Sequence, residues 1–183
     1  YIYYGVRQAL KFGAENSLIM DIGGGSTEFI ICNKDEVLWK ESFDLGVYRI
    51  KEMFNPSDPI SEAEVEKIKS HLDLVLTPLF QAIEQHSVKE LIGSSGSFDS
   101  FAEMIAGHID EFEILNGKTE YSFELNEFNE LYKRLLPTTE AQRYQIKGLV
   151  PMRVDTIVLA AIFVDYLLKK LDIQNMRLST YAL

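Results

Sequence analysis

The segment Asp21–Glu28, which reads DIGGGSTE, constrains this chain more than any other. Apolar residues precede it at 18–20 and follow it at 29–31, so the pattern predicts a strand, a tight glycine turn and a second strand. The three glycines allow the backbone to turn sharply and to approach a ligand closely, because no Cβ intervenes. Successive N–H groups in such a turn form a concave site for an anion.

Two carboxylates, Asp21 and Glu28, flank this turn. Asp21 ends an apolar strand, where an unpaired carboxylate is costly. Glu28 is in line with Ile30 under the alternation of a strand, so it also needs a partner. One acid on each side suits a divalent cation, or the positioning of a water, next to bound phosphate. The simpler alternative is a hairpin turn with two solvated acids, since a bare run of glycines is a weak signal.

A second loop of similar character occurs where the chain reads GSSGS. It follows a short apolar strand expected over residues 88–93, and it precedes a helix expected to begin near Phe98. A hydroxylic turn at a helix N-terminus suits an anion or a nucleotide. Plain capping of the helix by Ser95 or Ser97 is the alternative. The candidate nucleotide or polyphosphate contacts are Gly93, Ser94, Ser95, Gly96 and Ser97.

Five segments together resemble the Ppx/GppA family of exopolyphosphatases and guanosine pentaphosphate phosphohydrolases, which belongs to the actin-like ATPase superfamily. Residues 21–28 resemble its second phosphate loop, and residues 91–97 resemble its Gly-Thr-Ser-Gly-Thr loop. Residues 3–6 resemble the helix just after its catalytic-acid motif, residues 43–50 its sLplGavrl segment, and residues 153–155 its Arg-Ala-Asp helix start. The order and spacing of these segments agree over nearly the whole chain.

The resemblance implies a role for each residue of the first loop. The predicted phosphate contacts are Gly23, Gly24, Gly25, Ser26 and Thr27. Asp21 and Glu28 are the predicted catalytic and metal-binding residues, with Asp21 holding a divalent ion such as Mg²⁺ and Glu28 placing the ion or the attacking water. The implied substrate is polyphosphate or guanosine pentaphosphate, whose terminal phosphate is released by hydrolysis.

The resemblance is incomplete in ways that matter. Ser94, Ser97 and Val154 depart from the family pattern, although the two serines keep the hydroxyl. The family's first phosphate loop and its catalytic glutamate, which precedes the Tyr-x-Gly-Val helix, have no counterpart within residues 1–183. We therefore expect a single domain that corresponds to the second, C-terminal domain of a two-domain phosphatase. Without the first domain we expect negligible activity.

The expected fold class is α/β, with the ribonuclease-H-like fold of the actin-like superfamily. We expect a mixed sheet of about five strands, the first three antiparallel, with helices on both faces. The first three strands are predicted over 16–22, 27–32 and 37–43, and an edge strand over 121–125. Pro78 should kink one helix and Pro151 should begin the last long one. Residues 107–119 look like a loop.

Arg153 and Asp155 lie at the predicted start of that last helix. One interpretation is that both pair with other structural groups. The other is that Arg153 helps to set the loop geometry behind the site. The sequence leaves both open.

Composition excludes several classes of protein. A length of 183 residues with 46% hydrophobic content fits one compact domain. The net charge of −10 argues against nucleic-acid binding, and the longest apolar run, 157–164, is too short for a membrane span. Cys32 is the single cysteine, which rules out an internal disulfide and fits a reducing cytoplasm. The expected partners are the phosphate substrate and the first domain, with a homodimer as an open alternative.

Three other functions remain open at this point. A kinase or ATPase of the same superfamily would grip ATP with the loops at Asp21 and Ser94 and would transfer phosphate to an acceptor. A regulatory module would bind guanosine tetra- or pentaphosphate without turnover. A purely structural domain explains neither Glu28 nor the two loops that combine glycine with hydroxyl groups.

Overall fold

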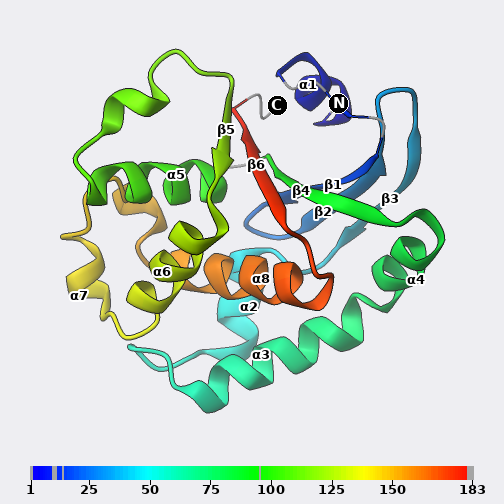
Figure 1. The fold of residues 1–183 in the computed structure, drawn as a ribbon. Coiled ribbons are helices and arrows are strands. Elements are labelled where there is room, and N and C mark those ends of the chain that lie inside the picture. The colour runs from blue at the N-terminus through cyan, green and yellow to red at the C-terminus, as the bar shows by residue number, and fades with distance from the viewer. Residues whose placement is uncertain (1, 10–11, 14, 95, 181–183) are drawn as a thin grey trace.

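A six-stranded mixed sheet forms the centre of the molecule (Figure 1). The computed structural model describes residues 2–9, 12–13, 15–94 and 96–180. The strands are β1 (Asn16–Ile22), β2 (Thr27–Cys32), β3 (Val37–Phe43), β4 (Val88–Gly93), β5 (Glu120–Phe123) and β6 (Asn175–Ser179). They lie side by side in the order β3-β2-β1-β4-β6-β5.

The pairing of the strands agrees with the predicted fold class. β1, β2 and β3 form an antiparallel meander, while β1, β4 and β6 run parallel to one another. β5 pairs antiparallel with β6 at the edge of the sheet, as predicted for an edge strand, although it ends at Phe123. The expected mixed sheet of about five strands has six, since residues 175–179 pair with β4 and residues 120–123 add the edge strand beyond them.

Helices cover both faces of the sheet, as predicted. They are α1 (Ile2–Ala9), α2 (Val47–Phe54), α3 (Glu62–Val75), α4 (Thr77–His86), α5 (Gly96–His108), α6 (Leu125–Leu135), α7 (Glu140–Arg143) and α8 (Ile157–Lys170), with short 3-10 helices η1 (Phe112–Leu115) and η2 (Pro151–Arg153). The main core packs α8 and the neighbouring helices against one face. On the other face, α1 contributes Tyr3 and Val6 to a smaller cluster.

Strand alternation decides which face carries the two acids of the first loop. Leu18 and Met20 point into the main core, whereas Ile19 packs in the cluster with α1. Because successive side chains of a strand point to opposite faces, Asp21 shares the face of Ile19. The same rule places Glu28 on the face of Ile30, which also belongs to the smaller cluster. Both acids therefore lie on the face away from the main core.

The last long helix begins later than the sequence predicts. Pro151 starts η2 instead, and α8 starts at Ile157. The physical reason is a side chain that replaces a helical hydrogen bond. The carbonyl oxygen of Val154 accepts from Nε of Arg143 at 2.6 Å, so it is not used in an α-helical turn. The predicted helix start is therefore corrected to a separate turn at residues 151–153.

Two other predicted elements differ from the observed ones. The kink at Pro78 is a complete break, with α3 ending at Val75 and α4 starting at Thr77, so that Pro78 lies in the first turn of α4. A proline is well tolerated there because the first N–H groups of a helix have no partner within it. The predicted loop over 107–119 contains the end of α5 and all of η1.

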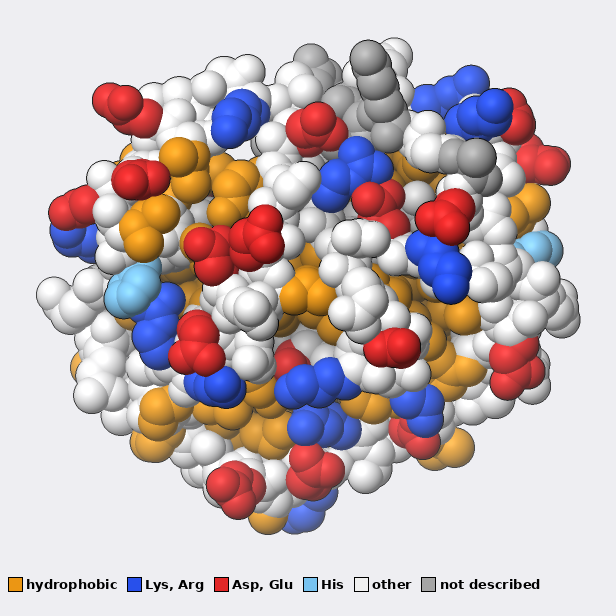
Figure 2. Space-filling model, viewed as in Figure 1, with side chains coloured by type: hydrophobic (Ala, Val, Ile, Leu, Met, Phe, Trp, Pro, Cys, Tyr) orange, Lys and Arg blue, Asp and Glu red, His pale blue; other side chains and the backbone are white. Residues whose placement is uncertain are grey.

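The surface carries charges of both signs. Figure 2 shows acidic and basic side chains intermixed on the face that it draws, and they do not gather into a continuous basic area there. Within the ranges that the structure describes, no helix combines the length and the apolarity that crossing a bilayer requires.

Replacing Arg143 by Met should lower the stability of the fold. The Arg143 side chain is buried and donates to the carbonyl oxygens of Val154 and Thr138 and to the Asp58 carboxylate. Its loss leaves the two carbonyl oxygens without these donors, whereas the Asp58 carboxylate keeps the N–H of Glu140. We expect the free energy of unfolding to fall by about 2–3 kcal/mol, measured in urea. The matched control is Lys133→Met. Lys133 is exposed, so its replacement should change the free energy of unfolding by less than about 0.5 kcal/mol. Equal losses in both variants would contradict this account.

Candidate functional site

The glycine loop, residues 23–26, closes the β1–β2 hairpin. It lies at the edge of the sheet formed by the carboxyl ends of the parallel strands β1 and β4. Ile22 pairs with Thr27 as the last rung of the ladder, and the Gly23 N–H donates to the Ser26 carbonyl at 2.9 Å. Among the described residues, only Gly117 and Gly148 are glycines with a left-handed φ. The glycines of this loop are therefore needed for close approach to neighbouring atoms and not for a left-handed backbone.

The backbone of the glycine loop is held from one side by α2. The carbonyl oxygens of residues 23, 24 and 25 accept hydrogen bonds from the N–H of Val47, the N–H of Tyr48 and Nε of Arg49, each at 3.0 Å. In a trans peptide the N–H points away from the carbonyl of the same unit. The N–H groups of residues 24–26 therefore point away from α2, and no described residue accepts from them. Three such neighbouring donors form a site for an anion.

The packing around the loop explains two of the glycines. A Cβ on Gly46, which precedes α2, would lie 2.3 Å from the carbonyl carbon and oxygen of Gly24. A Cβ on Gly24 would lie 3.0 Å from the ring of Tyr48. Gly25 has open space instead, with nothing within 4 Å of the position of a Cβ. The loop is thus clamped at Gly24 and open at Gly25.

Asp21 and Glu28 face each other across the β1–β2 ladder as direct cross-strand partners. Both are half-buried. Burial, and next to it the charge of Glu28, raises the pKa of Asp21 to about 6. Two like charges in this position repel each other, so the pair gains from a bound cation or proton.

The Glu28 carboxylate is held in place by two hydroxyl groups. Its Oε1 accepts from Ser26 Oγ at 2.5 Å and from Ser42 Oγ at 2.7 Å. Its Oε2 has no hydrogen-bond partner in the described part of the chain. One oxygen therefore fixes the orientation of the group, and the other is available to a ligand.

The pair of acids fits a divalent cation that takes its other ligands from outside the protein. The described residues contain no group of three or more His, Cys, Asp or Glu that would hold a metal ion by themselves. Mg²⁺ is usually bound through one or two carboxylates together with waters and substrate phosphates. Asp21 and Glu28 supply the oxygen donors that such an ion prefers.

Thr27 differs from the other residues predicted to contact phosphate. Its side chain is completely buried, and its Oγ1 donates to the carbonyl of Leu45 at 3.0 Å. The hydroxyl therefore ties β2 to the segment that leads into α2. The predicted contact of Thr27 with phosphate stays a prediction, and its position supports a structural part for the side chain.

The second loop lies at the same edge of the sheet as the glycine loop. Gly93 pairs with Met20 in the parallel β1–β4 ladder, and the Ser94 N–H donates to the Met20 carbonyl at 2.9 Å. Carboxyl ends of parallel strands meet at one edge of a sheet. Because both loops directly follow strands, the sequence predicts that they lie at the same edge of the sheet and face one cleft; the shared edge is confirmed.

The residues of the second loop are unequal in their surroundings. Ser94 is fully buried, and its Oγ has no hydrogen-bond partner among the described residues. Gly96 begins α5 and Ser97 is almost buried. Gly93 is required because a Cβ there would lie 2.1 Å from the Phe98 ring. Ser95, the remaining predicted contact, lies outside the described residues.

Arg153 lies beside the second loop, a position that the sequence left open. A Cβ on Gly96 would lie 1.5 Å from its Nη2, so the guanidinium rests on the first turn of α5. It makes no hydrogen bond or ion pair within the ranges that the structure describes. A cation at the positive end of a helix is unfavourable unless an anion joins them. Asp99 in that first turn supplies part of the negative charge, and the guanidinium donors, which have no hydrogen-bond partner among the described residues, leave room for a further anion at the second loop.

The charge of Arg153 also reaches two acids on α5. Burial raises the pKa values of Asp99 and Glu103, and the positive charge of Arg153 opposes the rise in both. The structure therefore supports a different interpretation for each of the two charged residues in the 153–155 motif. Asp155 pairs with Lys51 at 2.8 Å and is structural, whereas Arg153 faces the candidate site.

One short segment connects the two loops. The Tyr48 hydroxyl donates to the carbonyl of Met152 at 3.4 Å, while the Tyr48 ring packs against Gly24 of the first loop. Arg153, the next residue, rests on Gly96 of the second loop. The η2 turn therefore sets the position of both loops relative to each other.

Comparisons with known proteins agree with this geometry. The sequence model described as the Ppx/GppA phosphatase family matches residues 1–183. A relative from Haemophilus influenzae is 28% identical over 166 residues, which cover 91% of this chain and 49% of the relative. The chain spans about half the length of the curated relatives it matches.

Solved structures extend the comparison to the fold. The crystal structure of an exopolyphosphatase from Cytophaga hutchinsonii superimposes with a TM-score of 0.94 at 40% identity, over 99% of this chain and 58% of that chain. The Aquifex aeolicus PPX-GPPA enzyme superimposes with a TM-score of 0.83 over 100% of this chain and 58% of that chain, but at 18% identity it supports the fold alone.

Gly46→Ala should disturb the site, and Gly25→Ala should not. The new Cβ at position 46 collides with backbone atoms of Gly24, which cannot rotate away, so the loop must shift. We expect a loss of about 1–3 kcal/mol in the free energy of unfolding. At position 25 the methyl group enters open space, and the loss should be under about 0.5 kcal/mol. The two thermal midpoints, measured side by side, decide the matter.

Asp21→Asn should stabilise the fold at high pH only. The raised pKa of Asp21, about 6 against an ordinary 3.8, means that the folded chain binds this proton more tightly than the unfolded chain. The stability that protonated Asp21 contributes is full below about pH 4 and is lost as the pH rises through 6. The variant should therefore melt above the wild type at pH 8, and the gap should close at pH 4. A gap that is independent of pH would refute the burial of this charge, and the exposed Asp35→Asn serves as control.

Proposed function

The chain belongs to the Ppx/GppA phosphatase family, and on that basis we propose that it hydrolyses the terminal phosphoanhydride bond of inorganic polyphosphate as part of a longer enzyme. The observation that carries the proposal is the pair Asp21 and Glu28 beside the unpartnered N–H groups of residues 24–26. The solved relative with a TM-score of 0.94 is named an exopolyphosphatase, which supports the same substrate class.

The terminal phosphate binds the glycine loop in this proposal. The N–H groups of residues 24–26 point to one side, and each donates to a phosphate oxygen. Backbone dipoles fixed by α2 do not have to reorganise when charge develops on the phosphate. This is how a chain with a net charge of −10 binds a polyanion without a lysine-rich surface.

The neighbouring phosphate of the substrate binds at the second loop. Arg153 supplies a guanidinium there, and α5 presents its N-terminus to the same place. A charge-assisted contact from arginine and a helix N-terminus favour the same anion. The buried Ser94 hydroxyl, which has no partner among the described residues, is a further donor at this loop.

Glu28 orients the attacking water. Its Oε1 is fixed by the hydroxyls of Ser26 and Ser42, so Oε2 accepts from a water at a defined position. Asp21 lies opposite and shares the task of neutralising the phosphate. Mg²⁺, held by Asp21 and Glu28 together with water and phosphate oxygens, would lower the charge repulsion between the phosphate and the nucleophile.

The general base of the reaction lies outside residues 1–183 in this proposal, as the resemblance to the family implies. Phosphoryl transfer depends mainly on positioning and on charge neutralisation, both of which need the facing half of a cleft. We therefore propose that this chain alone binds phosphate and turns over negligibly. The facing half would come from a first domain of the same protein.

The cytoplasm is the proposed location. Cys32 is buried, and burial followed by the charge of Glu90 raises the pKa of its thiol to about 12. Such a thiol is inert and needs no oxidising compartment. A homodimer stays a prediction.

Asp21→Asn and Glu28→Gln in the full-length protein should each cut turnover on the order of 10²-fold or more, because removing one preorganised electrostatic group costs that much. The assay is release of free phosphate from polyphosphate. Asp35→Asn is the matched control, since Asp35 is exposed in the β2–β3 turn, at the opposite end of β2 from the glycine loop. Thermal midpoints should stay unchanged or rise in the two site variants.

Parallel assays separate the proposal from its rivals. Guanosine pentaphosphate, tested beside polyphosphate, shows which terminal phosphate is preferred. Phosphate transfer from ATP to an acceptor would favour a kinase of the same superfamily. Tight binding of guanosine tetra- or pentaphosphate, without turnover of any substrate, would favour a regulatory module. If Asp21→Asn and Glu28→Gln lose activity and also have lower thermal midpoints, the two acids are structural.

A further inference from the structure

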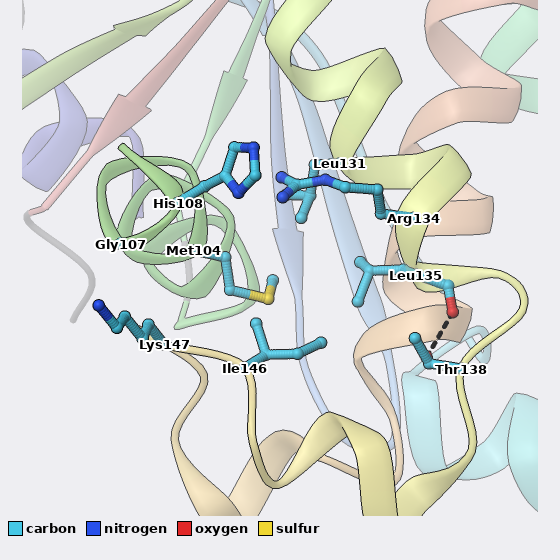
Figure 3. A pocket seen from close by; sticks show the side chains of 9 residues that line it. All are labelled: Met104, Gly107, His108, Leu131, Arg134, Leu135, Thr138, Ile146 and Lys147. Carbon is cyan, nitrogen blue, oxygen red and sulfur yellow. Dashed lines mark hydrogen bonds between the residues drawn. The ribbon is translucent and has the colours of Figure 1, made fainter. Parts of the chain in front are cut away.

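A cavity of about 440 Å³ opens between the end of α5, α6 and the segment that follows α7 (Figure 3). Its lining residues are Met104, Gly107, His108, Leu131, Arg134, Leu135, Thr138, Ile146 and Lys147. The cavity is distinct from the candidate phosphate site. That site lies at the N-terminus of α5, and a helix of 13 residues places its other end about 20 Å away.

The interior of the cavity is apolar. Met104, Leu131 and Leu135 are almost completely buried, and Ile146 is half-buried. Figure 3 shows Met104 and Ile146 on one side of the space, with Leu131 and Leu135 on the other. Thr138 adds little polarity, because its Oγ1 already donates to the Leu135 carbonyl at 2.5 Å. The volume and the apolar walls fit the body of a small organic molecule.

Apart from Thr138, the polar side chains at the cavity are those of basic residues. His108 and Arg134 reach toward each other across its mouth (Figure 3), and Lys147 points away and pairs with Asp110 at 2.9 Å. None of the described residues that line the cavity is acidic, although the chain has 28 acidic residues against 18 lysines and arginines. The Arg134 side chain makes no hydrogen bond or ion pair in the described ranges, and its charge reaches Glu130 on the same helix only at longer range.

Helix ends account for only part of this arrangement. His108 and Arg134 lie in the last turns of α5 and α6, where basic side chains favour the helix dipole. Two of the terminal carbonyls nearby already have partners, since Ala106 accepts from the Glu111 N–H and Leu135 accepts from the Thr138 N–H. His108 and Arg134 are exposed, and among the described residues nothing accepts from their side chains, so these donors are accessible to a ligand.

We propose that this cavity binds a small amphiphilic anion. Its apolar body, an aromatic ring system by preference, lies between Met104 and Leu131. Its carboxylate, phosphate or sulfonate accepts from Arg134 and His108. The site is independent of the phosphate site and of the proposed hydrolysis.

Two fluorescent probes of the same shape test the proposal: anilinonaphthalene sulfonate, which is an anion, and N-phenylnaphthylamine, which is uncharged. Both are titrated into the full-length protein. We expect the anion to bind saturably at one site. Arg134→Gln should weaken it about 10-fold or more, because a hydrogen bond to a charged group contributes about 1.5–3 kcal/mol. The affinity for the uncharged probe should change by less than about 2-fold in the same variant, since this probe binds through contacts with the apolar lining of the cavity.

Two further variants complete the test. Lys133→Gln removes a neighbouring cation of α6 that pairs with Glu130 outside the cavity, so neither probe should respond. Ile146→Trp fills the space from a half-buried position, and both probes should be lost while near-ultraviolet circular dichroism shows an intact fold. The proposal is overturned if anion binding survives both Arg134→Gln and Ile146→Trp. It is also overturned if the full-length protein binds neither probe, because another segment then covers the cavity.

Discussion

The candidate site depends on three hydrogen bonds between the start of α2 and the glycine loop. Val47, Tyr48 and Arg49 bind the carbonyl oxygens of residues 23–25, which turns the N–H groups of residues 24–26 to the opposite side. The first turn of a helix is commonly an anion site itself. Here those donors are used within the protein, and the anion site moves from the helix to the loop that the helix orients.

The η2 turn connects the glycine loop to the second loop. Tyr48 reaches both Gly24 and the Met152 carbonyl, and Arg153 rests on Gly96. The turn is itself fixed by Arg143, which holds the Val154 carbonyl, and by the ion pair of Lys51 with Asp155. The cost of starting α8 only at Ile157 is thus offset by side-chain bonds that keep Arg153 against α5.

The edge of the sheet that carries the two loops has few charged groups for binding phosphate. The chain has a large acidic excess, yet the groups proposed to contact phosphate are backbone N–H donors, the Ser94 hydroxyl and a single guanidinium. The cross-strand register brings the two acids on β1 and β2 together, and burial, followed by the charge of Glu28, raises the pKa of Asp21. A site of this kind binds an anion and a cation side by side more favourably than either alone.

Local pattern was enough to predict the strands at 16–22, 27–32 and 37–43 and the placement of Asp21 and Glu28 on either side of one turn, because strand alternation and tight turns follow from short-range rules. The catalytic part of the two acids stays a prediction. Local pattern failed for the start of α8 and for the burial of Thr27, since Arg143 and Leu45 are distant in sequence from the backbone or hydroxyl groups that they bind. The position of Arg153 was equally undecided. Only tertiary packing places its guanidinium 57 residues away on Gly96, where the lack of a Cβ leaves just enough room.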